Sequence, residues 1–133
     1  MALLIGVLLA ISVGVFATGL NLDRDRAFYP VVMIVIAALY ALFAVMGAST
    51  HTLVLESLVG AVFVAVAVSG FRWSLWAVVA ALAAHGVFDL THGIFFANAS
   101  VPGWWPKCCL VYVVTVAAYL AWLLKSRRIR AAA

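Results

Sequence analysis

Charged residues are scarce in this chain of 133 residues. Asp, Glu, Lys and Arg together make up 9% of the sequence, whereas they make up about 25% of an average soluble domain. Apolar and aromatic residues, counted together with cysteine, make up 69%. Because so little polar surface cannot keep a folded chain in water, the composition indicates a membrane protein.

Cysteine and proline are also rare, with two and three residues, and there are nine glycines. These counts exclude a disulfide-rich secreted scaffold, a collagen-like fibre and a disordered chain. The net charge of +4 comes mostly from one short tail that carries no nucleic-acid-binding motif, so no nucleic-acid partner is expected. The expected partners are the lipid bilayer and, for the tail, anionic lipid headgroups. The tail residues are Lys125, Arg127, Arg128 and Arg130.

Five segments are long and apolar enough to cross a bilayer, which takes about 20 residues at ~1.5 Å each. The sequence therefore predicts an all-α, polytopic transmembrane bundle that forms one integral membrane domain over residues 1–133. The predicted spans are approximately 2–20, 29–47, 52–69, 74–97 and 108–124.

The distribution of basic residues predicts the orientation of these spans. Short cytoplasmic loops retain Lys and Arg during insertion, and five spans with an internal C-terminus leave only Lys107 outside. We therefore predict an external N-terminus, an internal C-terminus and a location in the bacterial inner membrane. The charged stretch 23–26 is expected to be a solvated turn. An alternative interpretation, in which the first segment is a cleaved signal peptide, leaves four spans.

Small residues recur every four positions in the third and fourth spans. Ala61, Ala65 and Ser69 lie on one face of the third, and Ala77 and Ala81 lie on one face of the fourth. Small side chains let membrane helices approach closely, so we expect these two helices to be in contact.

The fourth span contains ionisable residues that a bilayer disfavours. An unpaired carboxylate in the position of Asp89 costs about 2.5–3.5 kcal/mol on insertion scales, so Asp89 is expected to face protein, water or a partner. At ~100° per residue, His85 and His92 lie on the same helix face as Asp89. Glu56 and Cys109 are expected to lie in the same outer half of the bilayer as this face.

Three interpretations of these residues remain open. His85, Asp89, His92 and Cys109 are suitable ligands for a divalent metal ion, Zn²⁺ or Fe²⁺, with Asp89 and Glu56 as candidate catalytic residues. An Asp–His pair can instead carry protons. Alternatively, the same residues only hold neighbouring helices together by hydrogen bonds.

These interpretations correspond to three function classes. The first is a membrane protein with a metal-binding site in the outer half of the bilayer, acting as an enzyme on a lipid-soluble substrate. The second is a small transporter or channel with an Asp–His proton or ion site, which predicts a homo-oligomer because five short helices enclose little space. The third is an accessory subunit of a larger membrane complex.

The sequence also resembles a group of small, uncharacterised bacterial membrane proteins. The resemblance rests on the His85-x3-Asp89-x2-His92 motif, which is followed by a loop rich in proline and tryptophan (98–106) and then by Cys109. Membership would imply a multi-pass bundle in which this helix carries the characteristic motif. The chain departs from the pattern at Gly93, where the group has a second histidine.

Overall fold

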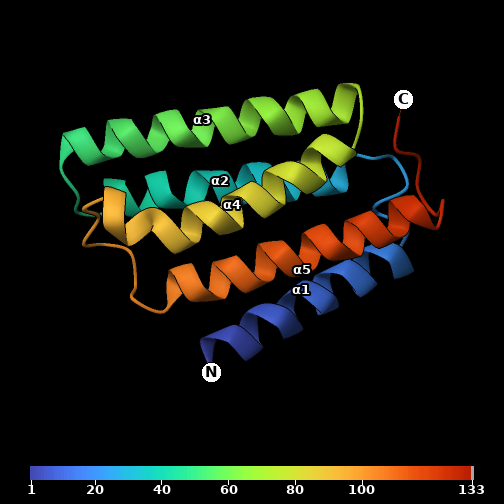
Figure 1. Cartoon of the computed structure of the whole chain (residues 1–133), viewed down its shortest axis with the longest axis horizontal. Coiled ribbons are helices and arrows are strands. Elements are labelled where there is room, and N and C mark those ends of the chain that lie inside the picture. Colours follow the sequence, from blue (N-terminus) through green and yellow to red (C-terminus); the bar gives the residue numbers. More distant parts are fainter. Residues whose placement is uncertain (133) are drawn as a thin grey trace.

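The structure is a computed structural model that describes residues 1–132, and it consists of five α-helices (Figure 1). Each helix is long and apolar enough to span a membrane. This confirms the predicted all-α fold and places one helix on each predicted segment. The helices are α1 (Ala2–Gly19), α2 (Phe28–Val45), α3 (Thr50–Arg72), α4 (Trp76–Phe95) and α5 (Trp105–Lys125).

The helices do not pack in the order of the sequence. α1 packs against α5, α5 packs against α4, and α4 packs against α3, so these four helices follow one another across the molecule (Figure 1). α2 packs mainly against α3 and also contacts α4. The first and last helices of the chain are therefore neighbours.

α1 approaches α5 closely through small residues. Its buried face is Gly6, Ala10, Gly14 and Ala17. A Cβ atom at Gly6 would collide with the carbonyl oxygen of Cys108, and one at Gly14 would lie 3.0 Å from the ring of Tyr119. Small residues at this spacing let the backbones of two helices approach closely. The close contact is stabilised by dispersion, although no large side chain takes part.

The predicted contact between the third and fourth helices is present, and Ala77 of α4 takes part in it as predicted: a Cβ atom at Gly70 would lie 3.5 Å from that of Ala77. Ala67 and Gly70 of α3 are buried, and a Cβ atom at Gly70 would lie 2.5 Å from Cγ2 of Val78. Ala61 and Ala65 are exposed and line a shallow groove beside α2. The prediction is thus wrong for Ala61 and Ala65, because the spacing of small residues does not show which of them pack against a helix and which face outward.

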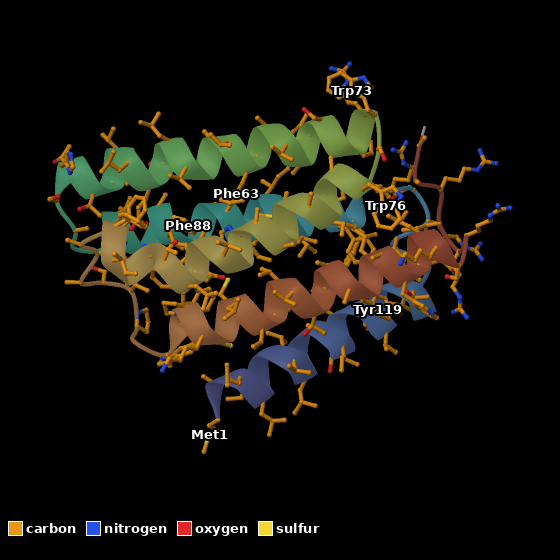
Figure 2. The ribbon with its side chains drawn as sticks, in the orientation of Figure 1. Met1, Phe63, Trp73, Trp76, Phe88 and Tyr119 are labelled. Atoms are coloured by element: carbon orange, nitrogen blue, oxygen red, sulfur yellow. The ribbon has the colours of Figure 1, made fainter. Side chains whose placement is uncertain are left out.

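The charged loop and the tail meet at one end of the bundle, which we call the basic end (residues 20–27, 73–75 and 126–132). Figure 2 shows nitrogen atoms gathered there. The prediction of a solvated turn over 23–26 is wrong for Asp23, which is 2% exposed and accepts a hydrogen bond of 2.8 Å from the hydroxyl of Thr18. This bond ties the loop to the end of α1.

The tail folds back over the basic end. The carbonyl oxygen of Ala131 accepts from the backbone N–H of Leu75 at 2.8 Å and from Nη2 of Arg26 at 3.2 Å. Ile129 is buried, and Arg128 lies 4.4 Å from the ring centroid of Trp122. The charged side chains of Lys125, Arg127, Arg128 and Arg130 remain exposed.

Candidate functional site

One face of α4 carries the polar residues that the sequence singles out. His85, Asp89 and His92 are all buried, with exposed fractions of 1%, 3% and 3%. The face is buried because α4 packs against three other helices, α2, α3 and α5. Phe63 of α3 and Phe88 of α4 lie in the layer between their helices (Figure 2), and the ring of Phe63 is 4.8 Å from that of His85.

His85, Asp89 and Cys109 come together as a group of three potential metal ligands, which we call the ligand group. One nitrogen of His85, one carboxylate oxygen of Asp89 and Sγ of Cys109 all lie within 4.8 Å of one another. Gly86 makes this possible, because a Cβ atom there would already lie 3.1 Å from Val114 of α5. The close approach of α4 and α5 carries Cys109 to the carboxylate.

Tyr40 of α2 fixes the carboxylate of the ligand group. Its hydroxyl donates a hydrogen bond of 2.6 Å to Oδ1 of Asp89. The other oxygen, Oδ2, is buried and makes no hydrogen bond, and neither ring nitrogen of His85 has a hydrogen-bond partner. Nε2 of His85 lies 3.7 Å from Oδ1 of Asp89, beyond hydrogen-bonding distance. Buried polar atoms without partners are rare and costly in folded proteins, so this group has spare capacity to bind.

Glu56 of α3 and His92 of α4 form a second group, the Glu–His pair. Oε1 of Glu56 lies 2.9 Å from Nε2 of His92 and accepts a hydrogen bond of 3.1 Å from Nδ2 of Asn98. Glu56 is 1% exposed, and its Oε2 makes no hydrogen bond. The pair is therefore shielded from solvent and held from three elements: α3, α4 and the loop that follows α4.

Tyr40 connects the two groups. Its ring stacks on that of His92, with centroids 4.1 Å apart, while its hydroxyl bonds to Asp89. Its backbone carbonyl oxygen also accepts from Nδ2 of Asn98 at 3.4 Å. Tyr40 was not among the predicted site residues, because a lone tyrosine in an apolar helix is typical of core packing. The only indication in the sequence was Asp89 itself, because a carboxylate inside a bundle requires a hydrogen-bond donor from another helix.

The structure thus separates residues that the sequence placed in one set. His85, Asp89 and Cys109 share the ligand group, whereas His92 lies with Glu56. Cys108 is buried but is not part of either group, and His51 is exposed at the start of α3. The remaining core toward the basic end is apolar and includes Met33, Val78, Leu82, Val116 and Leu120.

These observations define a class: a small all-helical protein with five candidate membrane spans and a buried polar cluster at one end of the bundle. No family model, no curated protein and no solved structure matches the chain. The function is therefore inferred from the geometry of the ligand group and the Glu–His pair.

Proposed function

We propose that the chain is an integral protein of the bacterial inner membrane, with its N-terminus outside, that binds a divalent metal ion in the outer half of the bilayer. The ligand group of His85, Asp89 and Cys109 holds the ion, and the metal is Zn²⁺ or Fe²⁺. The observation that carries the proposal is the convergence of three different ligand types from α4 and α5 within 4.8 Å, all of them buried.

The ligand group suits a catalytic metal site. Catalytic zinc sites have three protein ligands and one open position, and bonds of about 2.0–2.3 Å put neighbouring ligand atoms about 3.5 Å apart. The 3.7 Å separation between His85 and Asp89 is close to that value. Binding would draw the widest pair, now within 4.8 Å, together by about 1 Å. It would also give a partner to a ring nitrogen of His85.

The residues around the ligand group supply further parts of an active site. Tyr40 orients Asp89, as the hydrogen-bonded neighbours of metal ligands commonly do. Glu56 and His92 are a shielded acid–base pair on the other side of the Tyr40 ring, and we assign proton transfer to Glu56. A bound ion would polarise a water molecule or a substrate oxygen. Because the site is buried among candidate membrane spans, the substrate is proposed to be soluble in lipid.

Elemental analysis of the purified protein tests this proposal. We expect about one equivalent of zinc or iron per chain when the protein is purified without chelators. His85→Ala and Cys109→Ser should each lower the metal content at least about ten-fold, because each removes one of only three ligands. Folded wild-type protein that binds neither metal on titration would refute the proposal.

Two substitutions serve as matched controls. Cys108→Ser makes the same chemical change as Cys109→Ser at the neighbouring buried position, outside the ligand group, and should leave the metal content unchanged. His92→Gln distinguishes the two roles considered for His92. If His92 supports Glu56, the metal remains bound; if His92 is itself a ligand, as the sequence predicts, the metal is lost.

The transporter and accessory-subunit functions receive less support. A proton path must continue across the bundle, but an apolar core separates the polar cluster from the basic end. Flux into proteoliposomes that is abolished by Asp89→Asn would favour the transporter. An accessory subunit would copurify with its complex and would tolerate Asp89→Asn together with His92→Gln.

A further inference from the structure

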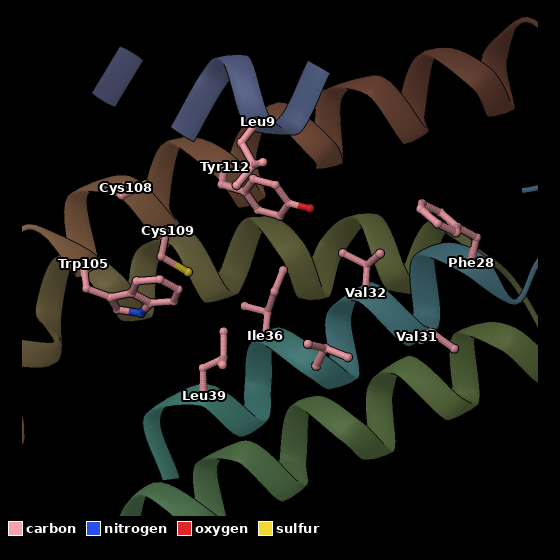
Figure 3. Close-up of a pocket in the computed structure, with 11 residues that line it drawn as sticks. Leu9, Phe28, Val31, Val32, Ile36, Leu39, Trp105, Cys108, Cys109 and Tyr112 are labelled. Carbon is pink, nitrogen blue, oxygen red and sulfur yellow. The ribbon is translucent and has the colours of Figure 1, made fainter. Parts of the chain in front are cut away.

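An elongated apolar pocket lies between α1, α2 and α5, and Cys109 forms part of its wall (Figure 3). Its volume is about 320 Å³, at the small end of the range for ligand pockets. The lining is apolar except for the thiols, the indole of Trp105 and the hydroxyl of Tyr112. α2 contributes the residues from Phe28 to Leu39 that face the pocket.

The shape of the pocket suits one hydrocarbon chain. Phe28 and Leu39 are eleven residues apart on one helix, which corresponds to about 16 Å. A narrow apolar pocket of this length suits an extended hydrocarbon chain better than a compact ligand.

The pocket opens sideways, because α1 and α2 make little contact with each other. In a bilayer this opening would face lipid chains and not water. The indole of Trp105 and the thiol of Cys109 lie at the end of the pocket away from Phe28, whereas the hydroxyl of Tyr112 lies nearer its middle (Figure 3). Nε1 of Trp105 is buried without a hydrogen-bond partner, and the thiol of Cys109 projects into the pocket (Figure 3).

Cys109 belongs both to the pocket wall and to the ligand group. A molecule whose chain lies along α2 would therefore bring its polar end to within contact of Cys109, with His85 and Asp89 directly behind. Trp105 supplies an N–H donor at the same place.

We propose that this pocket binds a lipid with one unbranched hydrocarbon chain and an oxygen-bearing end group, of the fatty-acid type. The chain lies along α2 toward Phe28, the end group lies at Trp105 and Cys109, and entry is lateral, between α1 and α2. The inference rests on the proposed function in one respect: it names the substrate class of the metal site.

Quenching of tryptophan fluorescence by a brominated fatty acid tests the pocket. Trp105 is the only tryptophan that lines it, so Trp73, Trp76, Trp104 and Trp122 are replaced by Phe. The protein is placed in nanodiscs of unbrominated phosphatidylcholine and titrated with 9,10-dibromostearic acid. A second titration uses 6,7-dibromostearic acid, whose bromines lie nearer the end group at Trp105. We expect saturable quenching of Trp105 that is stronger with the 6,7-dibromo acid than with the 9,10-dibromo acid.

Two valine substitutions on α2 provide the matched pair. Val32→Phe fills the pocket, and should weaken the apparent affinity at least about five-fold, because overpacking a fitted site is costly. Val45→Phe makes the same change at an exposed position on α2 outside the pocket and should have no effect. Quenching that does not saturate, or that is equal in all three proteins, would show contact with bulk lipid only and would overturn the inference.

Metal content measured on the same samples separates the two proposals. Saturable quenching in a protein without metal would refute the metal site and leave the pocket assignment standing. Bound metal without saturable quenching would refute the pocket assignment and leave the metal site standing. Val32→Phe should retain its metal, since Val32 is not part of the ligand group.

Discussion

Replacement of Tyr40 by Phe tests how the buried carboxylate is held. The change removes only the hydroxyl that donates 2.6 Å to Asp89, and the phenylalanine ring can still stack on His92. Interhelical hydrogen bonds in membranes average about 0.6 kcal/mol, with a maximum near 1.7. A donor lost from a buried charged group costs about 1.5–3 kcal/mol. Oδ2 of Asp89 already lacks a partner. Only the thiol of Cys109 would then remain near the carboxylate as a weak donor. We therefore expect a loss near the upper limit for membrane helices, about 1–2 kcal/mol in the free energy of unfolding.

Tyr29→Phe is the control for this experiment. Tyr29 lies on the same helix and is 1% exposed, against 2% for Tyr40, but its hydroxyl makes no hydrogen bond of ordinary length and angle. Its replacement should be neutral or slightly stabilising, because it removes a buried polar atom that has no partner. Both variants are unfolded with SDS in mixed micelles containing a chelator, and circular dichroism follows the loss of helix. Equal effects of the two substitutions, or a neutral Tyr40→Phe, would refute the assigned role of the Tyr40–Asp89 hydrogen bond.

Three further predictions concern the rest of the bundle. Gly6→Ala should destabilise the protein by about 1–3 kcal/mol in the same assay, because the new methyl group meets the carbonyl of Cys108. Gly93→Ala, where nothing lies within 4 Å, should be neutral or slightly stabilising; similar losses would argue against the α1–α5 contact. In cells expressing a variant without native cysteines, Lys107→Cys should react with an impermeant maleimide from outside and Arg72→Cys only after lysis; the opposite pattern would reverse the topology. Replacement of the exposed arginines between residues 127 and 130 by Gln should reduce the phosphatidylglycerol retained on the purified protein in native mass spectra, at about 1 kcal/mol per charge; unchanged retention would place the lipid contact elsewhere.

Much of the fold could be predicted from the sequence, because hydropathy and length alone determine where candidate spans lie. Helix pairing was harder to predict. Gly6, Ala10 and Gly14 lie four residues apart and form the face of α1 that packs against α5. Small residues recur every four positions in other segments as well, so the spacing alone did not identify this contact. A small face shows that a helix can pack closely, and it does not identify the neighbour.

The candidate site was predicted in part for a similar reason. Helical periodicity places His85, Asp89 and His92 on one face, and all three are buried. Periodicity cannot show that a separation of about two helical turns gives His85 and His92 different neighbours. That difference depends on residues of other helices: Cys109 reaches Asp89, while Glu56 and Asn98 reach His92. Tyr40 could not be identified without the three-dimensional structure, because His85, Asp89 and His92, which it contacts, lie on another helix and far away along the chain.

The pairing of α1 with α5 has a consequence for biosynthesis. α1 leaves the ribosome well before α5 has been synthesised. Until then, the face of α1 that carries Gly6, Ala10 and Gly14 must contact lipid or another helix. Cys109 arrives on the same late helix, which means that a nascent chain halted before residue 105 has neither the third ligand nor the wall of the lateral pocket. On the proposed function, the chain could bind the ion or the lipid only after α5 has been synthesised.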